Sequence, residues 1–438
     1  MKLRIAAGRH AFVHGKPAAT YGYSAPVLGP VIRVRKGDSL MMAVDNALDC
    51  DTTVHWHGLH VPGDVDGGPH QVIKPGGSWH PVLEINQPAS TAWFHPHPHH
   101  DTARQLYTGL TGMIIIDDGS DARLDLPRSY GVDDLPIILQ DRSFASDGAL
   151  LYAADPLATA YGSRGDIIIV NGAIAPVATV PRGPVRLRLL DAANARNFYL
   201  RFGDGRGFHV IASDGGFLAA PVAVTRLTIS PGERFEILVD FSNGKAVTLE
   251  TGPDEEMGLF GGPGAQGGSE HVPVMRFEPG ATPIAATALP LRLAEPAVAD
   301  PGKSARRRRF ILDSSMCTGE PREAQADHGR IMCINGKPHD MDRIDEQVKL
   351  GTTEIWEIFS VGMAHPFHIH GASFRVLGLG GTAPPAHLAG WKDVVLVEDK
   401  AELLVAFQQP ATARHPFMYH CHIAEHEQAG MMGQYVCM

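Results

Sequence analysis

The sequence contains no run of apolar residues long enough to cross a bilayer as a helix, which takes roughly 20 of them. Residues 1–8 also lack the apolar core of a secretory signal peptide. We therefore expect a soluble chain whose export signal has been removed or never existed.

Positive charge is scarce as well. The 38 Lys and Arg residues are outnumbered by 48 Asp and Glu residues, which gives a formal net charge of −10. The strongest basic segment is the run from Arg306 to Arg309, and we expect it to form a solvated loop. Without a basic patch or stripe, nucleic acid is not expected to be the main partner.

Long amphipathic helical patterns are hard to find, while short strand patterns recur. Residues 31–35 and 185–189 approach the polar and apolar alternation of half-buried strands, and 167–170 is a continuous apolar run that suits a fully buried strand. Turn signals are dense, with 48 Gly and 33 Pro. The pattern predicts an all-β chain of sandwiches or barrels rather than an α/β sheet.

Two changes in composition mark the expected domain boundaries. A turn at 117–120 follows an apolar strand pattern and closes a first domain at residues 1–125. A stretch rich in Ala and Pro forms a predicted linker, 281–303, between a second domain, 126–280, and a third, 304–438. With 44% hydrophobic residues, the chain can fill a core in each of three β-sandwich domains.

Histidine, in contrast, is abundant, with 23 residues against five Cys. There are five His-x-His pairs where random placement predicts roughly one. Because residues i and i+2 of a strand face the same side, each pair can direct two imidazoles at one site, as a metal cluster requires. The pairs are His55 and His57, His95 and His97, His97 and His99, His368 and His370, and His420 and His422.

The last of these pairs flanks a cysteine. Cys421 lies between His420 and His422, with His426 five residues after it and Met431 ten residues after it. A thiolate, two imidazoles and a weak axial thioether form the ligand set of a blue-copper site. Cys421, His426 and Met431 supply three of the four ligands. Since strand neighbours point to opposite faces, His420 and His422 are predicted to face other metals.

The missing imidazole is expected from His365. His368 and His370 form a same-face pair, and His365 precedes this pair, so it can turn the other way. For a single pair, surface or hydrogen-bonded histidines would be the simpler explanation. Four such motifs in order, one of which includes a cysteine, favour metal binding.

With these segments the chain resembles the multicopper oxidases, the family of laccases, ascorbate oxidase, bilirubin oxidase and bacterial cuprous oxidases. All four copper-binding segments of the family are present in order, and the resemblance covers nearly the whole chain. Within the family it looks most like the bacterial periplasmic cuprous oxidase. The supporting segments are His55 to Leu59, Asp64 to Pro69, Trp93 to His97, Asn171 to Ile174, Ile211 to Gly216 and Ala389 to Asp393.

The resemblance implies three cupredoxin-like Greek-key β-sandwich domains that bind four copper ions, with the second domain mainly supporting the other two. It implies a type 1 copper held by His365, Cys421 and His426 with Met431 axial. It also implies a type 2 copper on His55 and His368, and a type 3 pair on His57, His95, His97, His370, His420 and His422. These last three coppers would form one cluster between the first and third domains.

The implied activity is that of a copper-dependent oxidoreductase with O2 as the acceptor. Four one-electron oxidations of a small reducing substrate are coupled to the reduction of O2 to two waters. Asp66 and Glu427 match acids that the family places near the cluster. As a carboxylate in a water channel and a relay beside the ligand His426, they would deliver protons. The alternative for each is an ordinary solvated carboxylate. The resemblance further implies a periplasmic or secreted protein.

The identity of the reducing substrate stays open between phenols or aromatic amines, as in laccases, and Cu(I). The cuprous oxidase has a long methionine-rich segment in its third domain, whereas here the corresponding stretch contains only Met316, Met332 and Met341. Val361 replaces an acidic residue of the family, although Met363 is present. These departures favour a laccase-like activity with weaker cuprous oxidase activity. A non-enzymatic copper-binding or structural relative is a third, minor alternative.

Four other residues keep two interpretations each. Cys317 and Cys333 flank one loop and would either form a disulfide, as an exported protein permits, or remain buried thiols. His99 and His100 follow His97 and would either orient a ligand or be ordinary surface residues.

Overall fold

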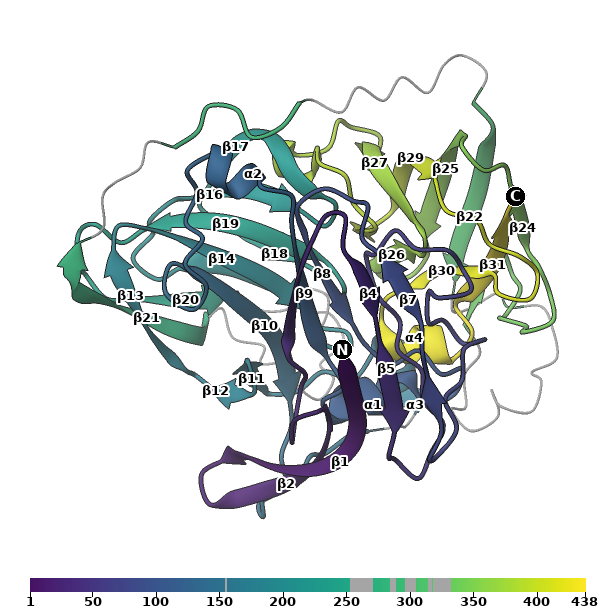
Figure 1. Cartoon of the computed structure of the whole chain (residues 1–438), viewed down its shortest axis with the longest axis horizontal. Helices are drawn as coiled ribbons and strands as arrows, with labels where there is room; N and C mark the ends of the chain where they lie inside the picture. The colour runs from purple at the N-terminus through teal and green to yellow at the C-terminus, as the bar shows by residue number, and fades with distance from the viewer. Residues whose placement is uncertain (154–155, 253–270, 284–288, 296–304, 314–316, 318–331) are drawn as a thin grey trace.

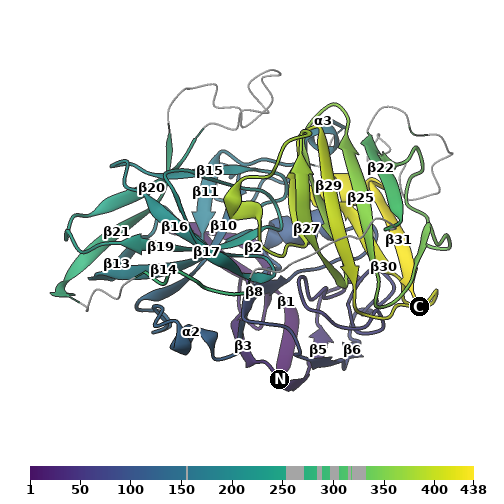
Figure 2. The same cartoon turned by 90° about the horizontal axis from the view of Figure 1, so that it is seen from above.

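The computed structural model consists of three β-sandwiches grouped around a common centre, as two perpendicular views show (Figure 1, Figure 2). It describes residues 1–438 except 154–155, 253–270, 284–288, 296–304, 314–316 and 318–331. Strands dominate and helices are short, so the predicted all-β sandwich fold is confirmed. Among the described residues, no helix is long and apolar enough to cross a membrane.

The first sandwich is formed by the N-terminal strands. One sheet has the order β2 (Lys16–Tyr23), β1 (Lys2–Val13), β5 (Ala43–Asn46) and β6 (Ser78–Trp79). A second contains β3 (Val31–Arg35), β9 (Gly112–Asp117) and β8 (Ser90–Phe94), and β4 (Ser39–Met41) pairs with β7 (Val82–Glu84). In β3 the predicted alternation holds, since Ile32 and Val34 are buried while Arg33 and Arg35 are exposed.

The second sandwich contains the largest sheet. Its order is β12 (Ala173–Ile174), β11 (Ile167–Val170), β10 (Asp134–Arg142), β14 (Pro184–Asp191), β19 (Arg234–Asp240), β16 (Phe208–Ser213) and β17 (Gly216–Val224). The facing sheet has the order β13 (Val177–Arg182), β21 (Val272–Pro283), β20 (Val247–Thr251), β15 (Phe198–Phe202) and β18 (Leu227–Ile229).

Strand β14 differs from its predicted half-buried state. Its apolar face packs into the sandwich core, but Arg186 and Arg188 on the other face are buried too. This face lies against β8 of the first sandwich, where Arg188 and Thr91 both bond to Glu236, each at 2.8 Å. Buried arginines need such partners, and the sequence alone does not reveal that a second sandwich covers them.

The third sandwich consists of two five-stranded sheets. One has the order β23 (Cys333–Ile334), β22 (Arg307–Asp313), β25 (Thr353–Ser360), β29 (Lys400–Phe407) and β27 (Ala372–Leu379). The other has the order β24 (Glu346–Val348), β31 (Met432–Cys437), β30 (Phe417–Cys421), β26 (His365–Ile369) and β28 (Val394–Val397). Their shared core includes Trp356, Phe310 and Tyr419.

Three short helices meet where the three sandwiches join. The described helices are α1 (Thr102–Thr108), α2 (Ser120–Arg123), α3 (Pro156–Tyr161), α4 (Ala424–Gln428) and the 3-10 helix η3 (Ala386–Leu388). Helix α4 packs against α1 and α3, which come from the other two sandwiches. The backbone N–H of Ala424 donates to the Asn194 carbonyl at 3.0 Å, and Gln428 accepts from the N–H of Ala103 at 3.1 Å. Helix α4 therefore fixes the third sandwich to both others.

The expectation of a solvated loop in the arginine run was wrong. Residues from Arg307 onward form β22, whose alternation turns Arg308 inward. Its guanidinium pairs there with Glu354 at 2.6 Å and with Glu346. The predicted linker 281–303 falls partly outside the described residues, and the domain boundaries stay a prediction.

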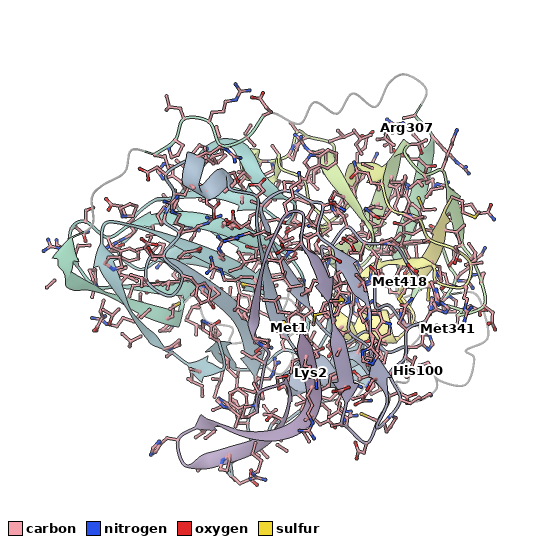
Figure 3. The ribbon with its side chains drawn as sticks, in the orientation of Figure 1. Met1, Lys2, His100, Arg307, Met341 and Met418 are labelled. Atoms are coloured by element: carbon pink, nitrogen blue, oxygen red, sulfur yellow. A yellow bond between two sulfur atoms is a disulfide. The ribbon has the colours of Figure 1, made fainter. Side chains whose placement is uncertain are left out.

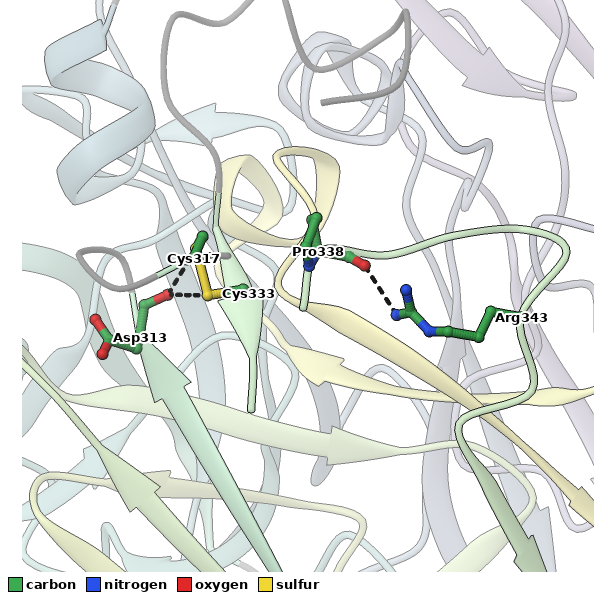
Figure 4. The surroundings of a disulfide bond; sticks show 5 residues. All are labelled: Asp313, Cys317, Cys333, Pro338 and Arg343. Atoms are coloured by element: carbon green, nitrogen blue, oxygen red, sulfur yellow. Dashed lines mark hydrogen bonds between the residues drawn. A yellow bond between two sulfur atoms is a disulfide. The ribbon is translucent and has the colours of Figure 1, made fainter. Parts of the chain in front are cut away.

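The structure joins Cys317 and Cys333 by a disulfide (Figure 4), which decides between the two interpretations of this pair. The bond lies at the end of β22, where the Asp313 carbonyl is 3.3 Å from the sulfur of Cys333. In the described part of the chain, the remaining cysteines, Cys50, Cys421 and Cys437, take part in no disulfide.

Candidate metal centre

Eight histidines meet in one buried cluster between the first and third sandwiches. His55 and His57 lie beyond β5, His95 and His97 follow β8, His368 and His370 lie at the end of β26, and His420 and His422 lie at the end of β30. Each of the eight is at most 2% exposed. The backbone pairs His55 with His95 in one sandwich and His368 with His420 in the other, so strand pairing assembles the cluster.

The cluster divides into groups that are small enough to share a metal ion. Within a group, one ligand atom of each member lies within 4.8 Å of the others. Two groups have no member in common: His57, His95 and His422 form one triad, and His97, His370 and His420 form the other. His55 and His368 remain as a pair beside His57.

Hydrogen bonds at the backs of the rings fix which nitrogen faces the cluster. Nδ1 of His55 donates to the Asp66 carbonyl at 3.0 Å, and Nδ1 of His368 donates to the Asp393 carbonyl at 2.8 Å. Nε2 of both rings is buried without a hydrogen-bond partner. Because a buried nitrogen lone pair without a partner is costly, these atoms fit metal ligation.

His57 has the opposite tautomer. Its Nε2 donates to the Asp393 carboxylate at 3.0 Å, which leaves the lone pair on Nδ1. Nδ1 lies 3.4 Å from Nε2 of His95, its partner in the triad. The Asp393 carboxylate therefore selects the nitrogen that His57 offers to a metal.

Burial favours the neutral form of most rings of the cluster. Burial lowers the pKa of six imidazoles far below the usual value, and charge on neighbouring imidazoles would lower it further. These imidazoles belong to His57, His95, His97, His368, His370 and His422. Burial also lowers the pKa of His420 to about 3. Since the neutral imidazole is the metal-binding form, the cluster is suited to cations.

A second group of donors lies on the other side of β30. Sγ of Cys421 is 3.6 Å from Nδ1 of His426. Together with a ring nitrogen of His365, these donor atoms all lie within 4.8 Å of one another. The two ring nitrogens of His365 are buried without a partner, and burial lowers the pKa of His365 to about 4. Met431 is held beside them, because the Cys421 N–H donates to its carbonyl at 3.1 Å.

The residues His420, Cys421 and His422 connect the two groups. Because successive side chains of a strand alternate, Cys421 lies with His365 and His426, while His420 and His422 join different triads of the cluster. A thiolate with two imidazoles suits copper, whose two oxidation states accept both donor types. One tripeptide thus connects the donor group that contains the thiol to the all-histidine cluster.

Three family models described as multicopper oxidase match residues 5–121, 140–247 and 314–438. The chain belongs to the multicopper oxidase family. Its sandwiches are therefore cupredoxin-like, its cofactors are copper ions, and its activity is the oxidation of a reducing substrate with O2 as the acceptor.

Relatives of this multicopper oxidase match it over nearly its whole length. The multicopper oxidase of Staphylococcus epidermidis is 36% identical, over 99% of this chain and 87% of its own. The cell division protein FtsP of Xenorhabdus nematophila is 38% identical, over 99% of this chain and 88% of its own. A solved structure, described as a bacterial laccase-like multicopper oxidase CueO from the lignin-degrading bacterium Ochrobactrum, is 47% identical with a TM-score of 0.92, covering 100% of this chain and 97% of that one.

Asp66 touches two histidines of the multicopper oxidase cluster. Its carboxylate accepts from Nδ1 of His370 at 2.8 Å and lies 3.3 Å from Nδ1 of His55. The side chain is buried, so it is not an ordinary solvated carboxylate. In this position it holds two rings by their outer nitrogens.

Glu427, on α4, contacts different histidines from the one expected. The sequence placed it beside His426, but its two oxygens lie 3.3 Å from Nδ1 of His97 and 3.4 Å from Nδ1 of His420. Helix α4 turns successive side chains to different directions, which a one-dimensional spacing does not reveal. Burial raises the pKa of Glu427 to about 8, so this carboxyl can hold a proton at neutral pH.

A buried network of charged residues behind the cluster was missed from the sequence. Arg234 binds the carboxylate of Asp393 through both terminal nitrogens, at 2.6 and 2.7 Å. The ammonium of Lys392 lies 2.9 Å from Asp214 and 3.1 Å from Glu233. The signal that could have revealed it was the placement of charged residues directly before or after apolar strand patterns.

Proposed function

We propose that the chain is a laccase-like oxidase, which couples four one-electron oxidations of phenolic or aromatic donors to the reduction of O2 to two waters. The observation that carries this proposal is the tripeptide of His420, Cys421 and His422, because it joins a thiolate site to the all-histidine cluster. A storage protein does not need two unlike sites joined by one stretch of backbone.

Four copper ions fit the donor groups. In this proposal the type 1 copper is held by His365, Cys421 and His426 with Met431 axial. The type 2 copper is held by His55 and His368, and the type 3 pair is held by the triads His57, His95 and His422, and His97, His370 and His420. When bound, the coppers supply one-electron storage and the place where O2 is reduced.

Asp66 and Glu427 are proposed to manage the protons that O2 reduction consumes. Glu427 is the proton donor, since both of its oxygens contact cluster histidines in a buried position. Asp66 holds His370 and His55 by hydrogen bonds and lies on the side of the cluster formed by the first sandwich.

An aromatic donor is favoured by the surroundings of the thiolate site. Nε2 of His426 donates to the Ala160 carbonyl at 3.3 Å, so the donor is proposed to dock beside α3 and pass its electron through this imidazole edge. Val361 is 37% exposed and presents no charge that would attract a metal cation. The similar Ochrobactrum enzyme is described as active on lignin model compounds and lignosulfonate.

Cu(I) is the second candidate substrate, and Met363 is the observation that favours it. This methionine is partly buried against the core of the third sandwich, two residues before His365. A thioether there can bind a soft cuprous ion. A methionine that only fills the core is the alternative, and the substitution below distinguishes them.

The test is oxygen uptake by the copper-loaded protein with 2,6-dimethoxyphenol, run with and without added Cu(I), beside a visible spectrum. Uptake with the phenol alone by a blue protein supports the laccase-like activity. Uptake that needs Cu(I), and that falls in Met363→Leu while the blue colour persists, would support the cuprous oxidase. A colourless, inactive protein after copper loading would contradict the copper assignment.

A periplasmic or secreted location is also proposed. The disulfide between Cys317 and Cys333 supports it, because disulfides persist in oxidising compartments. Fractionation of cells that express the full-length gene product tests this, and recovery of the protein in the cytoplasmic fraction alone would contradict it.

A further inference from the structure

Four histidines and a methionine outside the proposed copper ligands gather at one edge of the junction between the first and third sandwiches. His99 and His100 follow the ligand segment after β8, and His70 lies in the loop before β6. His339 and Met341 lie in the loop before β24. Figure 3 labels His100 and Met341 at this edge. We refer to these five residues as the accessory cluster.

Four of the five side chains of the accessory cluster are connected by pairwise contacts. Nδ1 of His99 is 2.5 Å from Nε2 of His100, and the rings of His99 and His339 are 4.9 Å apart. Nε2 of His339 lies 3.4 Å from the sulfur of Met341. His339 is only 5% exposed, and its Nδ1 is buried without a hydrogen-bond partner. Donor atoms of four side chains therefore lie near one another in pairs, and one buried ring nitrogen of His339 lacks a partner.

Backbone and side-chain bonds hold the loop that presents His339 and Met341. Arg343 donates to the Pro338 carbonyl at 2.8 Å, which closes the loop around these residues (Figure 4). The N–H of His339 donates to the Gly430 carbonyl at 3.0 Å. The loop is thus tied to the segment that connects α4 to Met431, and its side chains are oriented before any ligand arrives.

One buried amide links this loop to the first sandwich. The Gln434 nitrogen donates to the carbonyls of Met341 and Arg343, at 3.0 and 2.7 Å. The Gln434 oxygen accepts from Nε2 of His70 at 2.9 Å. Gln434 is fully buried, so it fixes His70 relative to the loop. Such outer contacts orient donors, as they do around established metal sites.

We propose that the accessory cluster binds one cuprous ion in addition to the four coppers of the oxidase. Imidazoles together with a thioether form a soft donor set, which suits Cu(I) better than Zn(II) or Mg2+. The exposed His100 provides access from solvent, and the buried His339 and its neighbour Met341 provide the inner ligands. His99 lies two residues after the copper-cluster ligand His97, so an ion here lies close to that cluster in the sequence. The site is distinct from the thiolate centre.

The test is an anaerobic Cu(I) titration of the reduced, copper-loaded protein in competition with bathocuproine disulfonate. We expect the protein to bind one equivalent of Cu(I) in addition to the copper content measured before the titration. Met341→Leu keeps the side-chain volume and should weaken binding of this equivalent by about tenfold or more, and His339→Ala should abolish it. His80→Ala and Met41→Leu are matched controls, because both residues are exposed and lie outside the cluster.

Each outcome decides the proposal. The proposal is overturned if the protein binds no extra equivalent of Cu(I). It is also overturned if Met341→Leu and His339→Ala both bind this equivalent as tightly as the unchanged protein. Displacement of the bound Cu(I) by an equal concentration of Zn(II) would also overturn it, because the thioether would then confer no selectivity. The copper content and visible spectrum of each variant are measured first. If His339→Ala does not fold, Met341→Leu and the exposed His100→Ala decide the result.

Discussion

The guanidinium of Arg234, in the second sandwich, binds both carboxylate oxygens of Asp393, in the third. Both side chains are buried, and Asp393 also accepts from Nε2 of His57 in the first sandwich at 3.0 Å. One ion pair therefore connects all three sandwiches and fixes the tautomer of a proposed copper ligand. This gives the second sandwich, which holds none of the proposed ligands, a direct part in shaping the cluster.

Replacing Arg234 by Leu should destabilise the copper-free protein by about 3–5 kcal/mol, because Asp393 would remain buried without its cation. Thermal or denaturant unfolding measures this loss. In protein that still folds, we expect a lower copper content, since the unpaired carboxylate no longer fixes His57. The matched control is Arg276→Leu, which removes a half-exposed pair with Glu278 and should change stability by less than about 1 kcal/mol. Equal effects of the two substitutions would contradict the role of Arg234.

Replacing Glu427 by Gln should slow O2 reduction while the blue colour persists. The amide keeps the shape of the carboxyl but cannot deliver a proton to the cluster, so turnover should fall by about 10²-fold or more. Oxygen uptake measures turnover, and the visible spectrum reports the thiolate site. Glu398→Gln, at an exposed position, is the control. Unchanged turnover in Glu427→Gln would remove the proposed role in proton delivery.

His60 should make the stability of the copper-loaded protein sensitive to mild acid. Burial lowers the pKa of His60 to about 4, and its Nε2 bonds to Ser373 across the sandwich junction at 2.8 Å. The unfolded chain, with a pKa near 6.5, then binds the proton more readily, so stability falls as the pH drops from about 6.5 toward 4. His60→Gln should remove about 1–3 kcal/mol of this loss. Unfolding at pH 7 and pH 5 provides the comparison, and identical pH dependence in both proteins would argue against it.

The disulfide predicts a specific thiol count. Of the five cysteines, two are joined, so 5 − 2 = 3 thiols should react in the copper-free, denatured, unreduced protein, and all five after reduction. Replacing Cys317 and Cys333 together by Ser should lower stability by about 3 kcal/mol, since the bond closes a loop of 16 residues. Five reactive thiols before reduction would show that the bond is absent.

The sequence alone determined the family, the all-β fold and the candidate ligands of both copper sites. It could do so because these properties depend on local spacing. Alternation along a strand separates Cys421 from its two neighbouring histidines wherever the strand lies, and a His-x-His pair directs both rings to one side.

Only the tertiary structure decided which elements meet. Contacts within the third sandwich buried Arg308 in β22. Contacts between sandwiches turned β14 from a half-buried strand into one buried on both faces. They directed Glu427 to His97 and His420 rather than to His426. Each of these contacts joins residues from different segments, so it depends on packing and charge pairing between surfaces that no local pattern describes.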